Sequence, residues 1–159
     1  MATQPNVERR VYETYIAVIR NSVGSTMFRN FYASVDGVKT DVMNDGQTSC
    51  AFYVSSVLTM LGLMKRVHAT VDATIKDLEE SGWSRVRETH SRLVLSGSGG
   101  DILVWEAKEI GGRRSRHIGF YIGNGLAVSN NFDTRTPQVH DDSYNGTREI
   151  EAVYFRWKF

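Results

Sequence analysis

The sequence predicts an α+β fold in which a helical first half precedes a strand-rich second half. Before Trp83, apolar residues recur at helical spacing, whereas after it they fall in short runs separated by glycine-rich turns. The chain has 159 residues, of which 41% are hydrophobic, and this is enough for one domain with a buried core. We therefore expect a single domain over residues 1–159, with a helix packed across a small antiparallel sheet or half-barrel.

The first 35 residues are expected to form a helical extension of this domain. Between about residues 6 and 21, apolar side chains recur near the spacing of an amphipathic helix. A second short helix is predicted around residues 28–32, which hold three aromatic side chains.

Two further helices are predicted before the strands begin. One starts at Cys50, continues to about Leu61 and ends at Gly62. The other follows Thr70, the predicted N-cap, and ends near Gly82. His68 lies just ahead of this cap and is expected to be a surface or capping residue.

Five short strands are expected in the second half, at residues 92–95, 101–105, 117–122, 126–130 and 149–158. Asn124-Gly125 joins the third and fourth of them. Both residues tolerate the positive φ of a type I′ turn, so this pair predicts a tight hairpin.

The only cysteine, Cys50, stands where the polar turn Thr48-Ser49 gives way to an apolar helix. Backbone N–H groups in the first turn of a helix lack internal partners, and together with the helix dipole they favour thiolate over thiol. The same amides can hold an oxyanion. The position indicates a reactive nucleophile with a lowered pKa, although a lone cysteine can also be a small core residue.

A nucleophilic cysteine needs a histidine that is close in space. Of the four histidines, His117 alone begins an apolar strand-like run. The predicted hairpin places it opposite the polar end of the next strand, Ser129 to Asn131. His117 is therefore the candidate base, with a polar orienting group beside it. His140 lies in the segment after that strand, which would pass near the site.

Three motifs occur in a fixed order: Ser49-Cys50-Ala51, then Gly100-Asp101 followed by an apolar strand, then His117-Ile118-Gly119. In this order the sequence resembles the NlpC/P60 and CHAP branch of the papain-like cysteine hydrolases, over roughly residues 40–131. The resemblance implies a papain-like fold, with Cys50 as nucleophile and His117 as base.

The resemblance also implies a third catalytic residue at position 129, where the family often has histidine and this chain has serine. Ser129 and Asn131 would share one face of a strand, and an asparagine carbonyl is a good acceptor for an imidazole N–H. Both remain candidates, with Asn130 behind them. An oxyanion donor ahead of the nucleophile is implied as well, and Tyr32 and Gln47 are the candidates.

The function that the resemblance implies is cleavage of an amide bond, most often in a peptidoglycan-type peptide stem. Cys50 would attack as a thiolate while His117 takes and returns the proton. An intracellular amidase or an acyltransferase could use the same pair. A protein of another class, a catalytically silent papain-like module that binds a peptide or glycan, is the alternative. No cofactor is implied, and we expect a monomer.

Composition and charge argue against several other classes of protein function. The net charge of +1 does not indicate a general affinity for nucleic acid or anionic membranes. There is no Cys-x-x-Cys pair and no His-x-x-x-His pair of the kind that binds zinc. The polar segment 1–8 does not resemble a signal peptide, so we expect a cytoplasmic or non-classically exported protein without a membrane span.

Overall fold

The computed structural model of the chain describes residues 4–86 and 98–159. Within these ranges the chain forms three helices and eight strands, in the order α1 (Val11–Asn21), β1 (Tyr32–Val35), β2 (Val38–Asp41), α2 (Cys50–Met60), α3 (Val71–Glu80), β3 (Ser84–Val86), β4 (Ile102–Ile110), β5 (Arg113–Gly123), β6 (Leu126–Asn130), β7 (Pro137–Asp141) and β8 (Ile150–Phe155).

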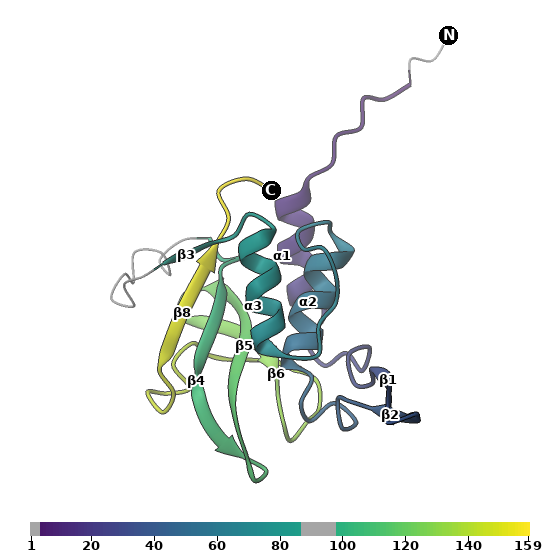
Figure 1. Cartoon of the computed structure of the whole chain (residues 1–159). Helices are drawn as coiled ribbons and strands as arrows, with labels where there is room; N and C mark the ends of the chain where they lie inside the picture. Colours follow the sequence, from purple (N-terminus) through teal and green to yellow (C-terminus); the bar gives the residue numbers. More distant parts are fainter. Residues whose placement is uncertain (1–3, 87–97) are drawn as a thin grey trace.

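Six of the strands form one antiparallel sheet in the order β3-β8-β4-β5-β6-β7. The three helices lie against one face of this sheet, and the β1-β2 hairpin projects to the side (Figure 1). The mixed α+β fold that the sequence predicts is confirmed at this level. Among the described residues, no helix is long and apolar enough to cross a membrane.

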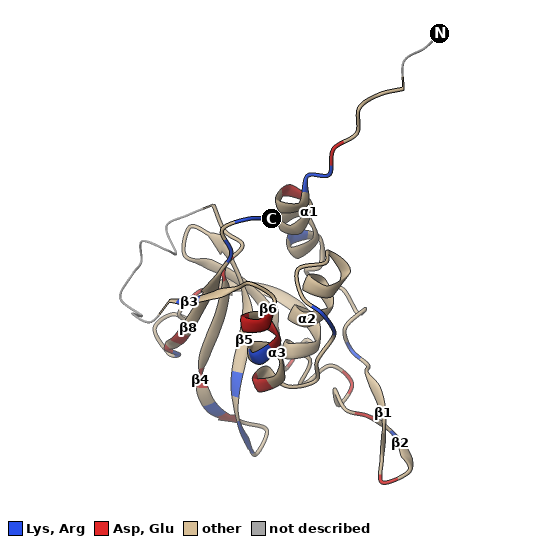
Figure 2. Ribbon diagram, turned by 45° about the horizontal axis from the view of Figure 1, so that its top comes forward, with Lys and Arg blue, Asp and Glu red and all other residues tan. Residues whose placement is uncertain are grey.

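Helix α2 is the central helix of the layer. It packs on β5 and β6 and also contacts α1 and α3. It carries no charged side chain, whereas α3 carries both acidic and basic ones (Figure 2). Burial around α2 therefore supplies most of the apolar contact that holds helices to sheet. Tyr15 and Ile19 of α1 are fully buried in the same core.

The opposite face of the sheet has a second, smaller core. Its buried members alternate along the strands with those that face the helices, as expected for a pleated sheet. They are Leu103, Trp105, Tyr121, Ala127 and Val153, with Tyr144 of the β7–β8 loop packed against them. The face away from the helices is thus covered in part by the loop that leads into β8.

Several predicted boundaries are confirmed. Helix α2 begins at Cys50, and Gly62 follows its end with a positive φ of 73°. The Thr70 side chain accepts a hydrogen bond from the Ala73 N–H, so it caps α3 as expected. Asn124 and Gly125 have φ values of 56° and 74°, which are those of a type I′ turn.

Other predictions are wrong. Helix α1 begins at Val11, because the exposed residues 6–10 bury nothing that would stabilise a further turn. Instead of a helix around residues 28–32, Tyr32 starts the β1-β2 hairpin, whose turn Asp36-Gly37 has positive φ at both positions. Strand β7 was not expected: it opens with Pro137 at the sheet edge, where a missing N–H is tolerated. The strand expected at 92–95 lies outside the described residues.

His68 is largely buried, so the surface position that was one of the two expectations for it is wrong. Its Nε2 lies 2.7 Å from Asp77 Oδ2, and both side chains are largely buried. Burial alone would raise the pKa of Asp77, but the hydrogen bonds from His68, Ser81 and the N–H groups of Lys65 and Arg66 lower it below its usual range. The carboxylate therefore ties the loop after α2 to helix α3.

This pair predicts a pH dependence of stability. Because the Asp77 pKa is lower in the folded chain than in the unfolded chain, its contribution is complete above about pH 5 and is lost as the pH falls below about 4. Asp77→Asn should cost about 1–3 kcal/mol at pH 7 and flatten the acid limb of the stability curve. Urea unfolding between pH 3 and 7 measures both. Exposed Asp72→Asn on the same helix is the control, and an unchanged acid limb in Asp77→Asn would contradict the assignment.

Candidate active site

Cys50 is held against the sheet by bonds from the loop that precedes it. The buried Ser49 hydroxyl donates to the carbonyl of Phe28 at 2.5 Å, and Asn130 Nδ2 of β6 donates to the carbonyl of Gly46 at 2.7 Å. With the loop fixed to β6 in this way, the Cys50 sulfur comes next to the backbone N–H of Ile118 in β5.

Glycine is required at position 46. Its φ is +87°, and a Cβ there would lie 2.9 Å from the carbonyl oxygen of Arg135. A side chain would push the loop off the β6–β7 connection. The small residue thus permits the approach that places Cys50.

His117 lies on β5 directly opposite Trp105 of β4, and the two ring centroids are 5.4 Å apart. Its Nε2 is 2.8 Å from Ser129 Oγ. Gly119 makes this contact possible, because a Cβ at that position would lie 2.6 Å from Ser129 Cβ and 2.7 Å from the Val128 carbonyl oxygen. The imidazole is therefore oriented by Ser129 on one side and by an indole on the other.

Ser129 is the centre of a buried polar network. Ser129 is only 1% exposed. Its hydroxyl also lies 2.7 Å from His140 Nε2 and 2.9 Å from the Tyr144 hydroxyl. The rings of His140 and Tyr144 stack with centroids 4.0 Å apart. Two residues from β7 and the loop after it thereby join the site.

The other expected orienting residue lies elsewhere. Asn131 Oδ1 accepts hydrogen bonds from the N–H groups of Asp133 and Thr134, at 2.9 and 2.8 Å, and so stabilises a turn. The structure brings Ser129 to His117 and leaves Asn131 in this turn.

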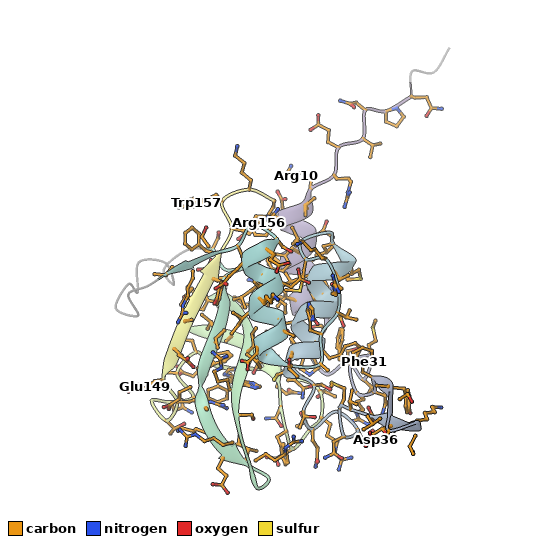
Figure 3. All side chains as sticks on the ribbon, viewed as in Figure 1. Arg10, Phe31, Asp36, Glu149, Arg156 and Trp157 are labelled. Atoms are coloured by element: carbon orange, nitrogen blue, oxygen red, sulfur yellow. The ribbon has the colours of Figure 1, made fainter. Side chains whose placement is uncertain are left out.

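The two oxyanion candidates are also placed. Tyr32 is 56% exposed on the β1-β2 hairpin, with the Lys39 ammonium 4.6 Å above its ring. Figure 3 shows Phe31 at the base of this hairpin and Asp36 at its tip, away from the sheet. Gln47 is in the turn before α2, where its Oε1 accepts from Asn44 Nδ2. In the part of the chain that the structure describes, the hydrogen-bond donors to the Cys50 sulfur are backbone N–H groups, including that of Ala51 in the first turn of α2.

Arg148 contributes a buried positive charge. It is 7% exposed, and its guanidinium donates to the carbonyl of Glu106, at 3.1 and 2.9 Å, and to that of Ser115 at 3.1 Å. These carbonyls belong to β4 and β5 beside the Trp105–His117 pair. Its charge acts on both Cys50 and His117.

Burial dominates the protonation of the site. It raises the pKa of the Cys50 thiol, although the N–H groups of Ile118 and Ala51 and the charge of Arg148 act in the opposite direction. Burial, followed by Arg148 and His140, lowers the pKa of His117 to about 3. The expected lowering of the Cys50 pKa is therefore wrong: the helix terminus does not offset the loss of solvent. At neutral pH the site holds a neutral thiol and a neutral imidazole.

Sequence reasoning missed three residues of this site. The sequence predicts only a strand at Trp105, and Tyr144 and Arg148 flank a turn, Asn145-Gly146, that has no periodic pattern. His140 is marked in the sequence only by its position after the Ser129 strand. Among the described residues, no group of three or more acidic, histidine or cysteine side chains could hold a metal ion.

The comparisons with known proteins bear on the fold. No family model matches the sequence, and neither does any curated protein. Among solved structures the chain is similar to that of NlpC2 from Trichomonas vaginalis, with a TM-score of 0.57 and 15% sequence identity. The match covers 96% of this chain and 49% of the other, so this chain spans about half the length of its neighbour. At this identity the likeness supports an NlpC-like fold.

Proposed function

We propose that the protein is a cysteine hydrolase in which Cys50 attacks an acyl carbon and His117 is the base. The observation that carries this proposal is the contact between the start of α2 and strand β5. The first residue of α2 lies against β5 at Ile118, directly after a histidine whose Nε2 is bonded to Ser129. A nucleophile, a base and an orienting group in this arrangement are the parts that acyl transfer through a thioester needs.

The neutral resting pair implies general-base attack rather than a preformed ion pair. As the sulfur bonds to the carbonyl carbon, the thiol proton passes to Nδ1 of His117, the ring nitrogen on the side away from Ser129. The oxyanion that forms is stabilised by N–H groups of the first turn of α2. The imidazolium then gives its proton to the leaving amine, and water hydrolyses the thioester with His117 again as base.

Arg148 supports the sulfur side of this reaction. Its positive charge favours the anionic forms of Cys50 and of the tetrahedral intermediate. The same charge disfavours the imidazolium of His117, so it keeps the base unprotonated between turnovers.

For the substrate we propose an amide bond in a peptide, with a peptidoglycan-type stem as the first choice. This rests on the motif order of the sequence and on the structural likeness to NlpC2 from Trichomonas vaginalis. An intracellular amidase or an acyltransferase would use the same residues. We propose that the chain acts as a single catalytic domain, with α1 as part of its core.

One observation favours a second candidate, a catalytically silent module that binds a peptide or glycan. The raised pKa of Cys50 and the His117 pKa of about 3 describe a weak acid beside a weak base. Such a pair reacts slowly unless bound substrate changes its surroundings. Binding of muropeptides without turnover would select this candidate.

We expect Cys50→Ala and His117→Ala each to lower amide turnover by about 10³-fold or more, because the two groups act as a unit. For the same reason the double variant should be no slower than either single one. Release of free amines from a panel of muropeptides and peptides measures this, with Ser115→Ala at an exposed position of β5 as the control. A double variant much slower than both single variants would contradict the proposed pair.

Arg148→Gln should raise the pKa of Cys50 further, because a neighbouring positive charge is removed while amide donors to the two carbonyls remain. The rate of alkylation by iodoacetamide against pH reports this at Cys50 alone, since the chain has one cysteine. In Arg148→Gln the ratio of the alkylation rate with anionic iodoacetate to that with neutral iodoacetamide should fall several-fold. Arg148→Lys, which keeps the charge, should stay close to wild type. An equal ratio in wild type and Arg148→Gln would show that Arg148 does not act on the thiol.

A further inference from the structure

The hydroxyl of Ser129 has three hydrogen-bond partners: His117 Nε2, His140 Nε2 and the Tyr144 hydroxyl. A hydroxyl has one hydrogen to donate and two lone pairs that accept. With three partners all three positions are used, so the direction of each bond depends on the other two.

His140 sets the first direction. Its Nδ1 lies 2.7 Å from the carbonyl oxygen of Asp141, and a carbonyl can only accept, so Nδ1 carries a hydrogen. Burial lowers the pKa of His140, which is therefore neutral at pH 7. In a neutral imidazole with Nδ1 protonated, Nε2 is an acceptor, so it must receive the hydrogen of Ser129.

The other two directions follow. Once the single hydrogen of Ser129 points to His140, its lone pairs must accept from Tyr144 O–H and from His117 Nε2–H. Any other arrangement would set lone pairs against each other across a buried contact. The lone pair of His117 is then on Nδ1, the nitrogen that the proposed reaction uses.

We infer that His140 is a positioning residue: through the Ser129 hydroxyl, it holds His117 as the Nε2–H tautomer and leaves Nδ1 free to take a proton. This inference rests on the proposed function for its catalytic meaning, while the tautomer itself is independent of turnover. The network extends over four residues, from the Asp141 carbonyl on β7 through His140 and Ser129 to His117 on β5, and of these only His117 takes part in the proposed proton transfer.

The packing around His140 suits this role. Its ring stacks on Tyr144 and lies 5.5 Å from the centroid of Trp105, whose Nε1 donates to the Asp142 carbonyl at 2.7 Å. These contacts limit a flip of the ring about its Cβ–Cγ bond, which would replace Nδ1 and Nε2 by Cδ2 and Cε1. The packing thus keeps Nδ1 at the Asp141 carbonyl and Nε2 at Ser129.

Nuclear magnetic resonance of isotope-labelled histidine in the full chain tests the inference, because nitrogen shifts distinguish protonated from unprotonated ring nitrogens. We expect His140 with its hydrogen on Nδ1 and His117 with its hydrogen on Nε2. In His140→Phe the Ser129 hydrogen is released to donate to His117, so a population with Nδ1–H should appear there. His140→Gln, whose amide can accept from Ser129, should restore the wild-type tautomer, and Asn131→Ala should leave it unchanged.

A steady-state measurement provides the second readout. We expect His140→Phe to lower kcat by about 10- to 100-fold with little change in KM, and His140→Gln to recover part of the loss. Wild-type His117 with its hydrogen on Nδ1 would overturn the inference, and so would a His140→Phe variant with unchanged tautomer and kcat. If His140→Phe does not fold, the wild-type and His140→Gln spectra still decide. A wild-type protein with the expected tautomers and no turnover would refute the proposed function alone.

Discussion

The contact between the start of α2 and the middle of β5 is the constraint on which the site depends. Two hydrogen bonds fix it: Ser49 to the Phe28 carbonyl, and Asn130 to the Gly46 carbonyl. One of these side chains belongs to the loop before α2 and the other to β6. The loop therefore cannot shift along the sheet without leaving buried polar groups unpaired. The apolar residues of α2 then bury the rest of the helix on β5 and β6. The position of the thiol is therefore a consequence of the core.

The same close packing determines the protonation of the site. Burial of Cys50 and His117 favours their neutral forms, and the only charge placed beside both of them among the described residues is that of Arg148. The polar groups beside them are paired in the hydrogen-bond network around Ser129. Gly119, which has no side chain, leaves room for this network. Partial burial and hydrogen bonding of the base suit the proton transfer that we propose for the attack step.

The sequence predicts well those features that depend on local pattern. The start of α2 at Cys50, the cap at Thr70 and the turn at Asn124-Gly125 each follow from neighbouring residues. Features set by tertiary contacts could not be found this way. The bonds of Ser129 to His140 and Tyr144 join residues that only strand pairing brings together, and the pKa of Cys50 depends on burial that no motif records. The structure also decides between Ser129 and Asn131 as the orienting residue, because the Asn131 side chain is hydrogen-bonded within a turn.

The central claim, that His117 activates Cys50 as an acyl acceptor, can be tested without knowing the natural substrate. The small activated ester 4-nitrophenyl acetate acylates reactive thiols and releases a coloured product. We predict a burst equivalent to one acetyl group per chain, located on Cys50 by peptide mass spectrometry, absent in Cys50→Ala and strongly slowed in His117→Ala. Acetylation of Cys50 at the same rate in wild type and His117→Ala, or labelling of lysines alone, would contradict it.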